Sequence, residues 1–496
     1  MSEIVEVKSM FQWNQLLCNE TLRKKEKVPT SWTEYPKDPF EEDYREIISS
    51  VSFRHLQDKA QIYQLEKGDF VRTRLTHSLE VSTTAKQLGS MILYNEKWRR
   101  IPVLQEISAD HARAIPTVLA CAGLLHDLGN PPFGHQGEYA IGHWFATALN
   151  RDDFTFRSRP IREVLNEQMC RDLCNFEGNA EGIRMLSKCR FPSEEQEANV
   201  SFATMSTMLK YPCSSVDMKP SSHDVREHKF GYFLSERDLV RTIRERTGVV
   251  VPGEPYTRNP LTYLLEAADD IAYVASDVED TVAKHTITVS SLHAFLQEKV
   301  EELPQDGDEE HQLRVLTAEG MLRNLTMRLE GTDGDENTRV ARFHDWTGYL
   351  RNWLMYVAAS SFVANIDAIM AGTYQGDLLE ESHHRYTIDI MKQQMKTNVY
   401  PRLGAIHIAA HTILTDLTQR YASAVVNWDT DQPLDFVSTT YVGMIPDRLK
   451  NAYRQEKTGD EAYDLYLRFR MVTDFLSSMT DGDVNDLYKK LNSISY

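Results

Sequence analysis

The sequence predicts a mainly α-helical protein, on three observations. Apolar residues recur with helical spacing over long segments, strand-like alternation is scarce, and helical propensity continues through the middle of the chain without a clear break. One stretch, residues 60–75, has the alternation of a short β-hairpin. With 496 residues, of which 41% are hydrophobic and 26% charged, the chain is long enough to bury a large core.

The first expected helix covers residues 76–93. Its spacing places four residues on one face, namely His77, Val81, Thr84 and Leu88. We expect this face to be buried, so that His77 points into the protein.

The second expected helix begins after Pro116 and ends at Gly129, which two prolines follow. Its inward-facing residues are Val118, Leu119, Ala122 and Leu125. The helix leads into "HDLGNPPFGHQGE", residues 126–138, which combines two histidines, an aspartate and a glutamate with prolines and glycines. This mixture suits neither a helix interior nor an ordinary solvated loop, so it is a candidate site.

The third expected helix covers residues 259–285, with Asn259 as its N-cap and Pro260 at its first position. Its apolar stripe comprises Leu261, Leu264, Leu265, Ala268, Ile271, Ala272, Ala275 and Val278. Such a stripe predicts a helix with one face in the core.

The same helix carries a line of polar residues, Asp269, Tyr273 and Asp277, at helical spacing. Asp269 borders the apolar stripe, whereas Asp270 lies nearly opposite it, so Asp269 is the better inward carboxylate. Taken alone, an acidic helix of this kind would be interpreted as a solvated face.

Later segments also predict helices, at residues 350–370, 403–424 and 462–478. The expected loops or linkers are residues 150–160, 211–229, 302–312 and 330–338. We expect an N-terminal segment at residues 1–50, a core at 51–290 and a C-terminal helical region at 291–496. Because helical propensity continues across the centre of the chain, no clear break in the sequence marks these boundaries.

Composition excludes several classes of protein. No window approaches 18 uninterrupted apolar residues, so we expect no membrane span. The N-terminus lacks the pattern of a signal peptide, and the six cysteines form no CxxC pair, which favours free thiols in the cytoplasm. A net charge of −18 repels nucleic acid and phosphates at long range, so a phosphorylated ligand needs a local basic cluster. One candidate cluster is Lys67, Arg72 and Arg74, although these residues could equally balance nearby surface acids.

Hydrolase metal sites combine neutral imidazole and carboxylate ligands and leave coordination positions open for water and substrate. His126 and Asp127 stand at the end of the second helix, His77 lies on the buried face of the first, and Asp269 borders the apolar stripe of the third. Individually, His77 could be a hydrogen-bonded core histidine and the His126–Asp127 dipeptide could occur by chance. Their order along the chain is what points to a metal site.

Five motifs make the pattern more specific. They are "RTRLTHSLEV", "HDLGNPPFGHQGE", "FEGNAEGIR", "EAADDIAY" and "DFLSSMTD". The order H…HD…D resembles the HD superfamily of metal-dependent phosphohydrolases, and the five motifs together resemble its deoxyguanosine triphosphate triphosphohydrolases (dGTPases). The resemblance extends over residues 54 to 481 and implies a helical HD core within residues 51–290, completed by the C-terminal region.

The resemblance implies that one divalent metal ion, Mn²⁺ or Mg²⁺, is held at each active site by His77, His126, Asp127 and Asp269. It also implies that His135 faces the substrate beside the metal, either activating the attacking water or protonating the leaving 5′-oxygen. Glu138, three residues later, would hold the imidazole in one tautomer and raise its basicity.

The implied reaction is hydrolysis of a deoxynucleoside triphosphate (dNTP), dGTP above all, at the α-phosphate, which releases deoxynucleoside and tripolyphosphate. By resemblance, the residues near the phosphates are Arg74, Lys210, Tyr211, Lys229 and Arg351. Asn179 and Glu181 lie near the same pocket by resemblance, and the sugar is contacted by Gln61, Tyr273 and Asp277. Residues 398–411 fall where guanine-specific members carry an acidic base-reading segment, and no acid aligns there.

The resemblance further implies a homo-oligomer, in many relatives a hexamer, and single-stranded DNA as an effector in some relatives. Two other functions remain open. Another HD phosphohydrolase, such as a 5′-deoxynucleotidase or an alarmone hydrolase, would share the metal residues but not the remaining motifs. A dNTP-binding or single-stranded-DNA-binding regulator with a vestigial site would be expected to lack a ligand, and here all four ligands are present.

Overall fold

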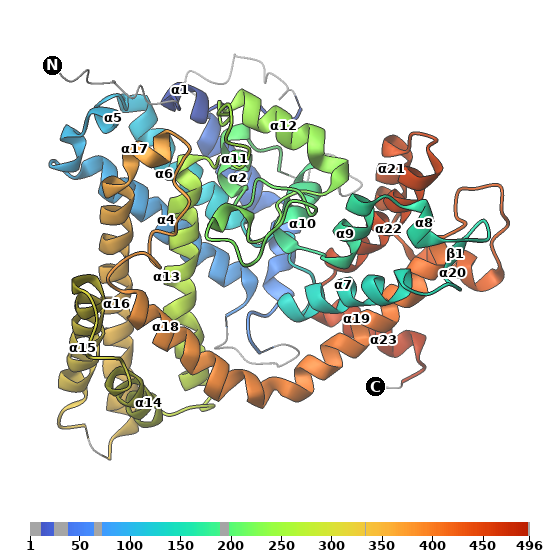
Figure 1. Cartoon of the computed structure of the whole chain (residues 1–496). Helices are drawn as coiled ribbons and strands as arrows, with labels where there is room; N and C mark the ends of the chain where they lie inside the picture. The colour runs from blue at the N-terminus through green and yellow to red at the C-terminus, as the bar shows by residue number, and fades with distance from the viewer. Residues whose placement is uncertain (1–10, 24–37, 64–71, 189–197, 333, 495–496) are drawn as a thin grey trace, which may run out of the picture.

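The computed structural model of the chain is almost entirely helical (Figure 1). It describes residues 11–23, 38–63, 72–188, 198–332 and 334–494. The described residues contain one sheet, an antiparallel hairpin of β1 (Thr155–Phe156) and β2 (Arg159–Pro160). The mainly helical prediction is therefore confirmed.

The predicted hairpin at residues 60–75 is only partly visible, because residues 64–71 lie outside the described residues. At its two ends Ala60 and Thr73 form an isolated antiparallel bridge. The sheet that the structure does contain falls in the predicted loop 150–160.

Three helices form the centre of the molecule: α4 (Arg74–Tyr94), α6 (Ala109–Leu125) and α13 (Pro260–Ala283). α4 packs against both of the others, and their apolar residues belong to one continuous core. On the predicted face of α4, His77, Val81 and Leu88 are buried and Thr84 is half-buried. This arrangement places the first predicted ligand inside the protein.

Helix α6 begins earlier than predicted, at Ala109 instead of after Pro116. The side chain of Ser108 caps it by accepting a hydrogen bond from the backbone N–H of His111 at 3.1 Å. Pro116 removes only one helical hydrogen bond, the one to the carbonyl of Ala112. Ala112 is half-buried beside the exposed first turns, where water can reach that carbonyl.

Helix α13 has the predicted start, with Pro260 at its first position and the Asn259 side chain accepting from the N–H of Leu261 at 3.0 Å. Its acids do not form a solvated face. Asp277, Glu279 and Asp280 are all buried, because α4, α6 and α16 (Glu336–Ala364) pack around the helix.

Two further helices complete the surroundings of the site. α7 (His135–Leu149) follows directly on the "HDLGNPPFG" turn, and α19 (Gly404–Val425) packs along it (Figure 1). The short helix α10 (Gly178–Ser187) begins next to the start of α7.

The three later helices are confirmed. Residues 350–370 form the end of α16 and then α17 (Ile366–Met370), with a break at Asn365, while residues 403–424 and 462–478 correspond to α19 and α22 (Glu461–Ser477). The predicted loops at residues 302–312 and 330–338 are shorter than expected, because α15 (Glu309–Leu329) begins inside the first and α16 inside the second. The other α-helices are α1 (Trp13–Leu16), α2 (Pro39–Ser49), α3 (Val51–His55), α5 (Pro102–Gln105), α8 (Ile161–Val164), α9 (Glu167–Cys174), α11 (Phe202–Met208), α12 (Arg237–Arg246), α14 (Val289–Glu301), α18 (Arg385–Gln394), α20 (Phe436–Met444), α21 (Asp447–Glu456) and α23 (Asp481–Leu491).

None of the helices in the described part of the chain combines the length and the apolar composition that crossing a bilayer requires.

Candidate metal centre and adjoining cavity

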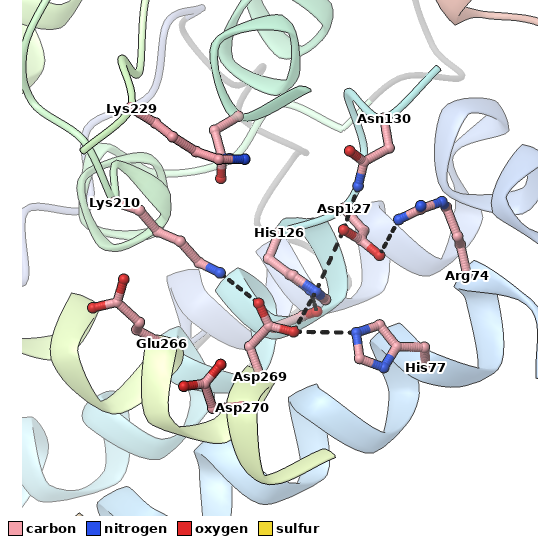
Figure 2. A network of polar contacts seen from close by, with 12 residues as sticks. Arg74, His77, His126, Asp127, Asn130, Lys210, Lys229, Glu266, Asp269 and Asp270 are labelled. Atoms are coloured by element: carbon pink, nitrogen blue, oxygen red, sulfur yellow. Dashed lines mark hydrogen bonds and ion pairs between the residues drawn. The ribbon is translucent and has the colours of Figure 1, made fainter. Parts of the chain in front are cut away.

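The three central helices bring four predicted ligands together (Figure 2). In the described part of the chain, one group of His, Cys, Asp and Glu side chains could hold a metal ion: His77, His126 and Asp127, whose ligand atoms all lie within 4.8 Å of one another. Asp269 joins this group from α13, since its Oδ1 is 3.2 Å from His77 Nε2 and 3.4 Å from His126 Nε2.

The imidazole ring of His126 has the orientation and tautomer expected of a metal ligand. Its Nδ1 lies 2.8 Å from the carbonyl oxygen of Gly123, one turn earlier, and this contact favours the tautomer in which Nδ1 carries the proton. In that tautomer Nε2 presents a lone pair, and Nε2 is buried without a hydrogen-bond partner among the described residues. An imidazole fixed through one nitrogen with the other left free is the usual arrangement of a metal ligand. The residues present therefore fit a divalent metal ion.

Cations keep both carboxylates ionised. Burial alone would raise the pKa of Asp127, but Arg74 and the two histidines outweigh it and hold that pKa far below its ordinary value. Arg74 Nη1 donates to Asp127 Oδ2 at 2.7 Å. Lys210 Nζ donates in the same way to Asp269 Oδ2 at 2.6 Å, and it lowers the pKa of Asp269 against the effect of burial. Ionised carboxylates are the form that binds a divalent cation.

The turn after Asp127 reverses the chain in a small space. Phe133 and Gly134 both have positive φ, of 64° and 56°. Gly134 also has ψ −130°, a combination with positive φ that L side chains rarely adopt, and a Cβ there would lie 2.4 Å from Arg74 Nη2. The turn ends at His135, the first residue of α7, which it places at the cavity.

His135 and Glu138 form the predicted pair. His135 Nδ1 lies 2.6 Å from Glu138 Oε2, while Glu138 Oε1 accepts from the backbone N–H of Gly178 at 2.8 Å. The hydrogen bond and charge of Glu138 raise the pKa of His135. Burial alone would raise the pKa of Glu138, but His135 and Lys229 lower it to about 2. Glu138 is therefore an ionised carboxylate that orients the ring and increases its basicity.

A cavity of about 500 Å³ opens beside these groups. Its described lining includes most of the predicted site residues: Gln61, Arg74, His77, His126, Asp127, His135, Asn179, Lys210, Tyr211, Lys229, Asp269, Tyr273 and Asp277. A cavity of this size suits a ligand the size of a nucleotide. Glu138 lies behind His135 and does not line the cavity.

The structure does not bring every predicted residue to the cavity. Arg351 does not line it, and instead donates to Glu279 Oε2 at 2.6 Å. Glu181 is fully buried, pairs with Arg470 at 2.5 Å and does not line the cavity. Lys67, from the predicted basic cluster, lies outside the described residues.

One wall carries residues predicted near the phosphates. Lys229 Nζ lies 3.1 Å from Glu177 Oε2, and the amide of Asn179 donates to Glu177 Oε1 at 2.7 Å. Tyr211 lines the same cavity, and burial raises its pKa to about 12, so its hydroxyl stays protonated. This wall therefore offers one cation and two neutral donors.

The same cavity is lined by residues predicted at the sugar. Tyr273 and Asp277 follow Asp269 on α13, and the hydroxyl of Tyr273 contacts that of Tyr400. Burial is the largest influence on Asp277 and raises its pKa to about 7. Its Oδ2 is buried and has no hydrogen-bond partner within the described chain.

Some lining residues were missed from the sequence, namely Ile62, Asn130, Phe133, Gln136, Asp270, Lys392, Tyr400, Leu403 and His407. Asn130 contacts Asp127, and its place three residues after that ligand was a signal that could have found it. In residues 398–411, helical spacing places Tyr400, Leu403 and His407 on one face, and this spacing is a signal that could have found them.

Comparison with known proteins finds one matching domain family and two full-length relatives. A model of the HD domain matches residues 74–176, which include His77, His126, Asp127 and the His135–Glu138 pair. Two relatives, from Listeria monocytogenes and Listeria innocua, are each 36% identical over 98% of this chain and 100% of their own length. Both are named deoxyguanosinetriphosphate triphosphohydrolase-like protein.

The chain belongs to this family of HD-domain proteins. It is an HD-domain hydrolase related to dGTPase-like proteins, with a candidate divalent-metal site at His77, His126 and Asp127. Asp269 lies beyond the part matched by the HD model, so its place in the site rests on its distances to the two histidines.

Proposed function

We propose that the protein hydrolyses deoxynucleoside triphosphates, dGTP foremost, at the α-phosphorus and releases deoxynucleoside and tripolyphosphate. The observation that carries the proposal is one cavity lined by the candidate metal group, by His135 with Glu138 behind it, and by one arginine and three lysine side chains. The cations of its described lining are Arg74, Lys210, Lys229 and Lys392.

The four ligands suit one Mn²⁺ or Mg²⁺ ion per site. His77, His126, Asp127 and Asp269 would hold a divalent ion, and the chemistry such an ion would supply is polarisation of a phosphate oxygen and a lower pKa of bound water. Arg74 and Lys210 hold the two carboxylates ionised and in place for that ion.

In this proposal His135 is the residue that accepts or donates a proton during hydrolysis. The oxygen of water forms a bond to the α-phosphorus, the bond from phosphorus to the 5′-oxygen breaks, and the released 5′-oxygen gains a proton. His135 either accepts the proton of the water or donates one to the 5′-oxygen. Glu138 keeps the ring in one orientation through its 2.6 Å contact with Nδ1, so Nε2 faces the reacting groups.

The remaining residues bind and orient the substrate. Tripolyphosphate is strongly anionic, so Lys229, Asn179 and Tyr211 serve its outer phosphates through charge and hydrogen bonds. Asp277 accepts a hydrogen bond from the 3′-hydroxyl, and Tyr273 packs beneath C2′, which leaves little room for a ribose 2′-hydroxyl.

Product analysis tests the proposal directly. The purified protein is incubated with Mn²⁺ and dGTP, and the products are separated by ion-exchange chromatography. We expect deoxyguanosine and tripolyphosphate in equal amounts. Formation of dGMP with pyrophosphate, or of dGDP with phosphate, would place the attack at a different bond and contradict the proposal. GTP serves as the control and should react more slowly.

A further inference from the structure

We propose that Asp481 and Lys59 are positioning residues, which hold the turn at residues 130–133 in the conformation that places His135 at the cavity. The inference rests on the proposed function, because it takes His135 as the residue that transfers the proton. We call Asp481 and Lys59 the turn clamp. Neither residue lines the cavity, so both act through the backbone of the turn.

The turn connects two parts of the site and has an uncommon backbone conformation. It begins after the proposed ligand Asp127, which Asn130 contacts (Figure 2), and it leads into His135. Phe133 and Gly134 have φ of 64° and 56°. Positive φ is costly for a residue with a side chain such as Phe133, and it persists only where surrounding contacts fix the backbone. The contacts that hold this backbone therefore also determine where His135 lies.

Asp481 provides the first of these contacts from a distant part of the chain. Its Oδ1 accepts a hydrogen bond from the backbone N–H of Phe133 at 2.9 Å, and its Oδ2 accepts one from the N–H of Ala60 at 3.0 Å. Ala60 precedes Gln61, which lines the cavity and donates to Asp127 at 3.2 Å. One buried carboxylate therefore joins two backbone segments that both lead into the site.

Lys59 provides the second contact. Its Nζ donates to the carbonyl oxygen of Asn130 at 2.8 Å and to that of Ser477, the last residue of α22, at 2.7 Å. Its own carbonyl oxygen accepts from the backbone N–H of Arg74 at 2.8 Å. The lysine is 2% exposed, and burying a charged group is costly unless hydrogen bonds compensate for the lost water. The two carbonyl oxygens supply that compensation, so Lys59 fixes the turn against α22.

Both contacts depend on the motif "DFLSSMTD", residues 474–481, which contains Ser477 and Asp481. None of its residues belongs to the described lining of the cavity, so contact with substrate does not account for the motif. Asp481 is the first residue of α23, where the Thr480 side chain accepts from the N–H of Asp483 at 3.1 Å. This cap orders the first turn of α23 and with it the carboxylate of Asp481.

Asp483 offers a matched control in the same helix. It is exposed, two residues beyond Asp481, and its side chain accepts from the backbone N–H of Thr480 at 3.2 Å. Asp483→Ala therefore weakens the cap of α23 and leaves the hydrogen bonds of Asp481 to Phe133 and Ala60 in place.

The experiment measures kcat and KM for dGTP, bound metal and Tm in the parent, Asp481→Ala, Lys59→Met and Asp483→Ala. In both clamp variants we expect kcat to fall about tenfold to a hundredfold, the scale for a displaced catalytic group, while the metal stays bound and KM changes less than kcat. Asp483→Ala should lower Tm and keep the parental kcat. Parental kcat in either clamp variant, an equal loss in Asp483→Ala, or loss of the metal would each overturn the inference.

A double-mutant cycle shows whether Asp481 acts through His135. If it does, adding Asp481→Ala to His135→Ala should lower the residual kcat by less than about threefold, because the group that Asp481 positions is already absent. A change that only loosens the fold would lower kcat by the same factor in both backgrounds. That result would show that Asp481 is not a positioning residue for His135.

A conservative variant and a measurement without substrate complete the test. Asp481→Asn keeps the shape and one acceptor oxygen, so its kcat should lie between those of the parent and Asp481→Ala. If Asp481→Ala does not fold, as judged by its Tm, Asp481→Asn carries the measurements, with a fall in kcat of about fivefold for one lost hydrogen bond. Hydrogen–deuterium exchange at residues 130–138 should be faster in either Asp481 variant and parental in Asp483→Ala. Equal exchange in all of them would show that Asp481 does not hold the turn.

The two proposals fail differently. If the parent protein releases no tripolyphosphate from any dNTP, the proposed function itself is wrong, and the exchange measurement still decides whether Asp481 holds the turn. If the parent releases tripolyphosphate but Asp481→Ala keeps the parental kcat, only the assignment of the turn clamp is wrong.

Discussion

The hydrogen bond between His135 and Glu138 should set one limb of the pH profile of activity. Glu138 raises the pKa of His135, so replacing its charge by a neutral amide lowers that pKa. If His135 acts as a base, the acidic limb of kcat against pH moves to lower pH in Glu138→Gln; if it acts as an acid, the alkaline limb moves to lower pH. Both roles therefore predict a shift in the same direction.

Steady-state kcat across the pH range measures this shift, and the limb that moves also identifies the role of His135. Glu298→Gln is the control, because Glu298 is an exposed glutamate of α14. A profile of Glu138→Gln that coincides with the parental one would show that His135 is not the titrating group.

Two single changes separate metal binding from proton transfer. Asp127→Ala removes a proposed ligand, so bound metal and activity should fall together. His135→Ala leaves the four ligands in place, so the metal should stay bound while turnover falls by ~10²–10⁴-fold, the usual scale for a positioned acid or base. Elemental analysis beside kcat for dGTP measures both quantities. Loss of metal from His135→Ala would make His135 a ligand, and unchanged turnover would make the loop merely structural.

Among secondary-structure elements, the contact between the "HDLGN" turn and α10 holds the site together. A Cβ on Gly129 would lie 2.1 Å from the backbone nitrogen of Gly182 and 2.2 Å from the carbonyl oxygen of Gly178. Backbone cannot move aside as a side chain can, so Gly129→Ala must push α10 away from the turn. We expect it to lower the free energy of unfolding by about 1–3 kcal/mol and to reduce turnover sharply.

Urea unfolding and kcat for dGTP measure these two effects. The matched control is Gly320→Ala in α15, where an added Cβ meets nothing within 4 Å and should stabilise the helix slightly. If Gly129→Ala is as stable and active as Gly320→Ala, the close packing of turn and helix does not matter to the site.

Local signals explain which elements the sequence predicts well. The cap Asn259 with Pro260 and the helical spacing of apolar residues specify α13 without knowledge of distant contacts. Pro116 misled the prediction of α6, because proline suits a first helical position and is also tolerated inside a helix at the cost of one hydrogen bond.

The cavity is lined by residues from segments that are distant in the sequence. The sequence alone therefore predicts only some of the lining residues. The order of His77, His126, Asp127 and Asp269, together with the resemblance of five motifs to a known family, predicted this group, and the structure brings the four side chains together. By contrast, Arg351 faces Glu279 and not the cavity, a choice made by the packing of α16 on α13. His407 reaches the cavity for the same reason, through the path of the chain into α19. Its helical spacing places it on one face with Tyr400 and Leu403, but that spacing does not show what the face contacts.

At the scale of the whole molecule, the metal group joins three separate parts of the fold. His77 and Asp269 are 192 residues apart in the sequence, and they come within 3.2 Å only when α4 and α13 pack together. A metal ion that needs all four ligands therefore binds the folded chain and not the unfolded one. Such binding stabilises the fold by about 2.7 kcal/mol when the free metal is about a hundredfold above its Kd.

We therefore expect Mn²⁺ to raise the Tm of the parent protein by a few degrees in calorimetry without substrate. Asp127→Ala should show no such rise, because it lacks a ligand. Asp447→Ala should respond like the parent, because it removes an exposed carboxylate at the start of α21. If Mn²⁺ raises the Tm of Asp127→Ala as much as that of the parent, the stabilising ion binds elsewhere, and the four residues from α4, α6 and α13 are not its site.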